Sequence, residues 1–360
     1  YRSNFAPSIR LLSAFVILFA TLWYMTGITK GLGHVIASVL GIPYAFGTFA
    51  MVSITCAYTI WGGMYSVLWT DAIQGIMMIA VAIIMVMLPF IYVGGVDEMF
   101  VRLADTQHLD RSGEPMGNGL VTFGSLVSFF YILGIGLAVG MKQIAEPRCL
   151  IRFYSIDNAE SMHFAMIWTP IFLGISLICV MGLGALVHGM ATDNEAAYLI
   201  QNTDEVVGFM LSKFDNPLVS GICIAGLFAA GMSSLASVML IVGTAFVQDM
   251  WHLVKPMDEK KIVPRTRWTI VFYCAVLYLV TLFPPAGIVE MTAFSGAVFA
   301  ASFFPAIFGG LYLRWGTDAG ALVSMLTGIL CCVIWRFGFR FRFEGLSDIH
   351  CEFRDVDMLT

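Results

Sequence analysis

The chain has 360 residues, of which 59% are hydrophobic and only 12% are charged, and its mean hydropathy is +0.85. A soluble domain carries about 25% charged residues, so this composition indicates a polytopic all-α membrane protein. The net charge of −5 comes with no basic tail or face, which argues against a nucleic-acid partner. The sequence contains no GxSxG, HExxH or Walker motif and no histidine cluster, so we expect neither catalytic residues nor an organic cofactor.

Nine apolar segments have about the length that a membrane-spanning helix needs, which is roughly 20 residues. The seventh is the shortest and stops before Pro284 and Pro285. In chain order the predicted helices are 9–28, 43–61, 70–93, 119–145, 162–189, 217–247, 268–283, 288–313 and 320–337.

The charges in the connecting loops predict the orientation. The 249–267 loop is basic and is expected in the cytoplasm, whereas the 94–118 and 190–216 loops are acidic and are expected outside. The amino end is then cytoplasmic. Because the chain starts without methionine, close to its first apolar segment, we expect upstream sequence to be missing. Residues 1–350 form the predicted transmembrane domain, and 351–360 form an atypical polar tail.

The sixth segment carries a row of small and hydroxyl side chains. Ala230, Ser233, Ser234 and Ser237 stand at positions i, i+3, i+4 and i+7, so they share one helical face. Hydroxyl and carbonyl oxygens are the ligands that a hard cation such as Na⁺ prefers. Small residues also let membrane helices pack closely, and the residues alone leave both interpretations open.

Two further groups are ionisable. Asp71, with Gln74 one turn later, is either a partner for a helix amino terminus or an ion-pathway carboxylate. Lys142 and Glu146 are spaced i, i+4 before Pro147, which predicts an ion pair between them or a lysine that snorkels toward the cytoplasmic interface.

Three motifs in the same order resemble the sodium/solute symporter family, and its proline and pantothenate branch in particular. They are GGMYSVLWTDAIQG (62–75), EPRCLIRFYS (146–155) and AAGMSSLASVML (229–240). The resemblance covers residues 1 to about 350. It implies a LeuT-type core of ten helices in two inverted repeats. The nine predicted helices would be core helices three to ten plus one peripheral helix, with the first core helices absent from the chain.

The resemblance also implies site residues. Ala230, Ser233 and Ser234 would be half of a sodium site, and Asp71 with Ser234 and Ser237 would form a second one. Val139 and Gln143 occupy solute-facing positions that are often aromatic in relatives, so the solute's identity stays open. The candidate aromatic walls of the solute site are Trp23 and Phe294.

The function implied is sodium-coupled import of a small organic solute by alternating access, with Na⁺ as the coupling ion. A proline-, pantothenate- or other carboxylate-like metabolite is the expected solute. The expected location is the cell membrane, specifically a bacterial inner membrane, with lipid around the helices and no obligate protein partner. Two alternatives stay open: a transporter-like sensor domain of a signalling protein, and a sodium-independent facilitator.

Overall fold

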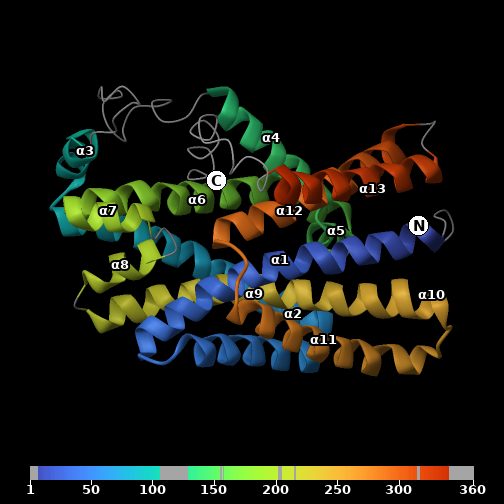
Figure 1. The fold of residues 1–360 in the computed structure, drawn as a ribbon. Helices are drawn as coiled ribbons and strands as arrows, with labels where there is room; N and C mark the ends of the chain where they lie inside the picture. Colours follow the sequence, from blue (N-terminus) through green and yellow to red (C-terminus); the bar gives the residue numbers. More distant parts are fainter. Residues whose placement is uncertain are drawn as a thin grey trace. The chain divides into compact units, whose positions relative to one another are not determined.

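A computed structural model describes residues 7–105, 129–154, 156, 158–201, 205–214, 216–313 and 317–339 of the chain. These residues form helices joined by short turns, and they include no strand (Figure 1). The predicted all-α class is confirmed. Within this part of the chain the helices form two compact units.

The first unit draws on Tyr1–Val67, Leu137–Ser155 and Ser234–Thr360. Three of its helices, α2, α4 and α9, continue into the second unit. The elements that contribute to the first unit are α1 (Pro7–Leu40), α2 (Tyr44–Val93), α4 (Phe129–Ala145), α5 (Pro147–Tyr154), α9 (Pro217–Thr244), the π-helix η3 (Ala245–Trp251), α10 (His252–Val254), α11 (Glu259–Leu282), α12 (Ile288–Tyr312), α13 (Asp318–Val333) and the π-helix η4 (Ile334–Phe339).

The core of this first unit lies where α1 meets α12 and α13. Val16, Phe294 and Phe299 are buried together there. Gly328 of α13 touches the α12 backbone so closely that a side-chain carbon would collide with the carbonyl group of Ala301. Close backbone contact at a small residue is the usual way that helices pack in lipid.

The second unit draws on Leu68–Gly136 and Ile156–Ser233. It contains parts of α2, α4 and α9 together with α3 (Val96–Asp105), α6 (Ala159–Met190), α7 (Asp193–Gln201) and α8 (Val206–Ser212). Its core is aliphatic and rich in methionine, with Met99, Leu186 and Met210 buried together. The turn from α2 to α3 uses Gly94 and Gly95, whose φ angles of 105° and 148° favour glycine.

The predicted helices 43–61 and 70–93 both lie in α2, an element of 50 residues that consists of two helices joined at a kink. The helix is broken locally at Gly63, whose φ of 62° and ψ of −161° are not helical. The kink lies within the interruption predicted between the two helices, and the aromatic and aliphatic residues that follow it are compatible with a helix.

Six helical stretches in the described residues are long and apolar enough to cross a membrane: Pro7–Ala37, Tyr44–Val93, Ala159–Met190, Pro217–Val254, Ile288–Tyr312 and Asp318–Phe337. They cover seven of the nine predicted segments, because α2 contains two. The other two correspond to α4 and α11. The described part of α4 has 17 residues, and α11 begins with the charged run that starts at Glu259. Its apolar part starts near Trp268 and ends before the two prolines, as predicted.

Candidate ion and solute site

The predicted hydroxyl row lies on α9, which is a regular α-helix through this region. Its four members are each partly buried. The Ser233 hydroxyl lies 3.5 Å from the Ala230 carbonyl oxygen, one turn earlier. A second contact is made by Ser237, whose hydroxyl accepts a hydrogen bond from Nη2 of Arg152 at 3.1 Å. The row is therefore polar and accessible, and a basic side chain from α5 binds its last member.

Asp71 lies on α2 and is partly buried. It belongs to the second unit, whereas Ser234 and Ser237 belong to the first. The grouping of these three residues into a second sodium site therefore stays a prediction.

The two predicted aromatic walls are neighbours in the first unit. The ring centroids of Trp23 on α1 and Phe294 on α12 are 4.9 Å apart, in an edge-to-face arrangement that aromatic pairs prefer. Phe19 and Phe337 extend this cluster, with centroids 6.1 and 6.2 Å from that of Phe294. Phe294 is only 7% exposed and belongs to the buried core of the first unit. Its role in solute binding stays a prediction.

Val139 and Gln143 occupy different surroundings although both lie on α4. The side chain of Val139 is 48% exposed. The amide oxygen of Gln143 accepts a hydrogen bond from the thiol of Cys149 in α5, with Oε1 and Sγ 3.5 Å apart. The amide thus bridges the end of α4 and the start of α5.

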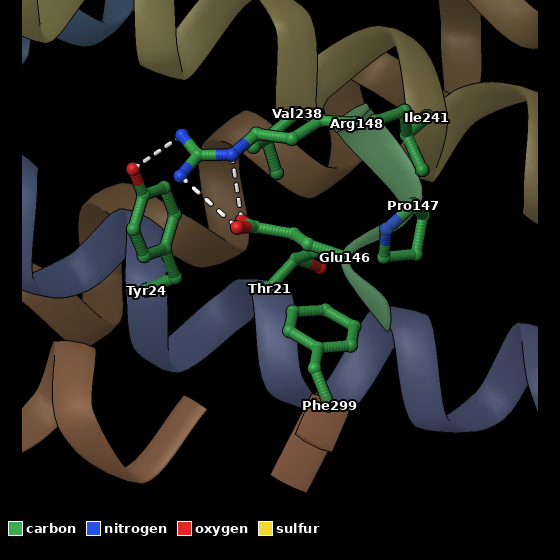
Figure 2. Close-up of a pocket in the computed structure, with 8 residues that line it drawn as sticks. All are labelled: Thr21, Tyr24, Glu146, Pro147, Arg148, Val238, Ile241 and Phe299. Atoms are coloured by element: carbon green, nitrogen blue, oxygen red, sulfur yellow. Dashed lines mark hydrogen bonds and ion pairs between the residues drawn. The ribbon is translucent and has the colours of Figure 1, made fainter. Parts of the chain in front are cut away.

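Sequence reasoning missed a buried polar group of the first unit, which Figure 2 shows. Nε of Arg148 lies 2.6 Å from Oε1 of Glu146, and its Nη2 lies 3.2 Å from Oε2. Nη1 of the same guanidinium donates to the Tyr24 hydroxyl at 2.5 Å. Glu146 is 3% exposed and the Arg148 side chain 18%. Together these side chains border a small pocket lined by Thr21, Tyr24, Glu146, Pro147, Arg148, Val238, Ile241 and Phe299.

The prediction that Lys142 pairs with Glu146 is therefore wrong, because the carboxylate is bound by Arg148. Pro147 is the cause: α4 ends at Ala145 and α5 begins at Pro147, so the i, i+4 geometry no longer applies to Glu146. The Glu146 carbonyl instead accepts the backbone N–H of Cys149 at 3.0 Å, in the first turn of α5. A proline directly after the carboxylate was the available signal.

Comparison with known proteins places the chain in a family. The model of the sodium:solute symporter family matches residues 2–328. The osmoregulated proline transporter OpuE of Bacillus subtilis is 25% identical over 333 residues, which cover 91% of this chain and 64% of that protein. The sodium/proline symporter of Escherichia coli is 26% identical over 355 residues, covering 95% of this chain and 66% of the symporter. The chain thus spans just under two thirds of the length of these relatives.

A solved structure supports the architecture. It is the substrate-bound outward-open state of a Na⁺-coupled sialic acid symporter, with a TM-score of 0.66 at 18% identity, covering 92% of this chain and 75% of that one. The expected helical bundle of the LeuT type is confirmed at the level of the fold. With the family model matched over most of its residues, the chain belongs to the sodium:solute symporter family.

Proposed function

We propose that the protein to which this chain belongs is a secondary active transporter that couples Na⁺ entry to the import of a small organic solute. The observation that carries the proposal is the hydroxyl row on α9 in a chain of this family. Ala230, Ser233 and Ser234 would supply a backbone carbonyl and two hydroxyls as ligands, replacing part of the ion's water shell.

A solute of the proline or pantothenate type fits this proposal best. Several relatives are named as proline transporters, among them OpuE and the symporter of Escherichia coli. The Trp23–Phe294 pair offers an apolar surface for such a ring or chain. The organisms of these relatives support the bacterial cell membrane as the location. Import would follow the sodium gradient and the membrane potential, which contributes about 2.3 kcal/mol per charge per 100 mV.

The test is uptake by the full-length protein in proteoliposomes. Radiolabelled L-proline, pantothenate, sialic acid and glucose are supplied with an inward Na⁺ gradient or with choline in its place. We expect uptake of one carboxylated solute only with Na⁺. Uptake that is the same with and without Na⁺ would favour the sodium-independent facilitator. No uptake of any solute, in a full-length protein that also contains a kinase-like module, would favour the sensor.

Variants of α9 test the ion site itself. The Ser233→Ala/Ser234→Ala double variant should raise the Na⁺ concentration for half-maximal uptake tenfold or more, since two cation ligands are lost. The matched control is Ser13→Ala/Ser324→Ala, which removes two partly buried hydroxyls. Among the residues that the structure describes, these hydroxyls bond to the helix carbonyls of Ile9 and Ala321 and to the Met325 sulfur. Equal sodium dependence in both double variants would contradict the proposal.

The second ion depends on Asp71, Ser234 and Ser237. If a second ion binds, the unmodified protein should show a Hill coefficient of sodium activation above one, and Asp71→Asn should lower it toward one. A coefficient near one in the unmodified protein would mean that a single Na⁺ is coupled.

A further inference from the structure

Lys142 is a second cation beside the Glu146–Arg148 pair. Its Nζ lies 5.6 Å from the ring centroid of Tyr24, and Cζ of Arg148 lies 4.7 Å from the same centroid. Tyr24 itself is only 8% exposed. Two positive groups therefore share one buried aromatic ring, which attracts each of them through its negative face.

The charges of this cluster do not balance. Both oxygens of Glu146 are bound by Arg148, at 2.6 and 3.2 Å. That leaves Lys142 with no ion pair among the residues that the structure describes. A partly buried cation without an anion is unfavourable in a membrane protein, and such groups usually mark a pathway or a ligand. Arg148 is already saturated by its carboxylate, so Lys142 is the group available to an incoming anion.

The lysine side chain also packs against α12. A side-chain carbon placed on Gly296 of α12 would lie 2.8 Å from Cδ of Lys142 and 3.1 Å from its Cε. The lysine stem thus crosses α12 at a residue that has no side chain. The adjoining Ser295 is fully buried, and its hydroxyl has no hydrogen-bond partner in the described part of the chain.

The helices that carry Tyr24 and Gly296 also carry an aromatic pair. Trp23 of α1 and Phe294 of α12 have ring centroids 4.9 Å apart. As helical neighbours of Tyr24 and Ser295 in sequence, these two rings point away from the lysine's own contacts. A cation and an aromatic pair presented by the same two helices match a ligand that joins a carboxylate to a small apolar body.

We propose that Lys142 binds the carboxylate of the transported solute and thereby selects carboxylated over uncharged solutes. This inference rests on the proposed function and assigns its specificity to one side chain. The ammonium donates to a carboxylate oxygen, while Glu146 and Tyr24 keep Arg148 engaged. No covalent step is involved.

The first test measures selectivity in the full-length protein in proteoliposomes with an inward Na⁺ gradient. Radiolabelled L-proline is the probe, and unlabelled L-proline and L-prolinamide, which lacks the carboxylate charge, are the competitors. Lys142→Met should raise the KM for proline roughly 10- to 100-fold, the value of one charged hydrogen bond. It should also abolish the preference for proline over its amide. Lys142→Arg, which keeps the charge, should recover part of both.

The matched control is Lys30→Met, which removes another lysine of the first unit whose Nζ donates to the Ala286 carbonyl at 3.4 Å. It should keep the preference for proline over prolinamide. A Lys142→Met protein with an unchanged KM and unchanged preference would overturn the proposal.

A binding measurement separates this inference from the proposed function. The Tm of the purified full-length protein is measured with L-proline, pantothenate or glucose, in NaCl or choline chloride. A carboxylate-induced rise in Tm that occurs without Na⁺ and is lost in Lys142→Met supports the lysine's role while contradicting sodium coupling. Sodium-driven uptake of glucose alone would support sodium coupling but overturn the proposed role of Lys142. The role of Lys142 would also be overturned if neither L-proline nor pantothenate raised the Tm. Lys142→Gln, checked by gel filtration, guards against loss of folding in the methionine variant.

Discussion

Two ion pairs of this protein have the same N–O distance but differ in how far their carboxylates are exposed to solvent. Nε of Arg148 lies 2.6 Å from Oε1 of Glu146 in the first unit, and Nζ of Lys213 lies 2.6 Å from Oε1 of Glu195 in the second. The side chain of Glu146 is 3% exposed, whereas that of Glu195 is 33% exposed. Distance alone therefore says little about what a charge pair contributes, because water competes for only one of these two pairs.

The largest effect is expected from removing one buried charge. Glu146→Gln leaves the Arg148 guanidinium without its anion and should lower the free energy of unfolding by about 3–5 kcal/mol. The measurement is denaturant unfolding of the purified protein in mixed micelles. Glu195→Gln is the matched control and should change the midpoint very little, since its pair is solvated.

A compensated variant sharpens the same comparison. Glu146→Leu/Arg148→Leu removes both charges and should recover most of the stability lost in Glu146→Gln, because no uncompensated charge remains. Equal losses in Glu146→Gln and Glu195→Gln would mean that burial does not separate the two pairs.

An intermediate effect is expected from removing one hydroxyl. Tyr24→Phe deprives Arg148 of the acceptor that lies 2.5 Å from its Nη1 and should lower the free energy of unfolding by about 1–3 kcal/mol, the usual result of an unsatisfied buried donor. Tyr198→Phe is the control, since its hydroxyl donates to Glu205 at 2.8 Å on an exposed surface. Thermal unfolding of the two variants side by side should show a clear loss in the first only.

The smallest effect is a pH dependence in the exposed pair. The Lys213 ammonium, together with the backbone N–H and hydroxyl of Thr192, lowers the pKa of Glu195 from 4.5 to about 2. A lowered carboxyl pKa stabilises the folded state above pH 4.5, and this contribution disappears as the pH falls from 4.5 toward 2. The stability difference between the unmodified protein and Glu195→Gln should therefore be constant near neutral pH and shrink only in acid. A difference that shrinks already between pH 7 and pH 5 would contradict the assignment.

The sequence predicted most of the helices because a run of about 20 apolar residues has few other stable forms. Each of the nine predicted segments is helical over its described residues, apart from single end residues such as Pro43, Phe283 and Leu313. The kink of α2 at Gly63 lies in the interruption predicted between 61 and 70. Its shape was not predictable from hydropathy, since a glycine with positive φ can either end a helix or bend it.

The polar contacts were less predictable. Local spacing predicted Lys142 as the partner of Glu146. Pro147 begins a new helix directly after Glu146, and Arg148 binds the carboxylate instead. The link to Tyr24 joins residues 124 positions apart, which one sequence does not reveal. Trp23 and Phe294, two aromatic candidates from the sequence, have neighbouring rings in the structure.

The break at Gly63 also divides a helix that is too long for one membrane crossing. A straight helix of 50 residues would be about 75 Å long, more than twice the hydrocarbon thickness of about 30 Å. A single residue without a side chain, held at a φ of 62°, is the point at which this long apolar run separates into two helices.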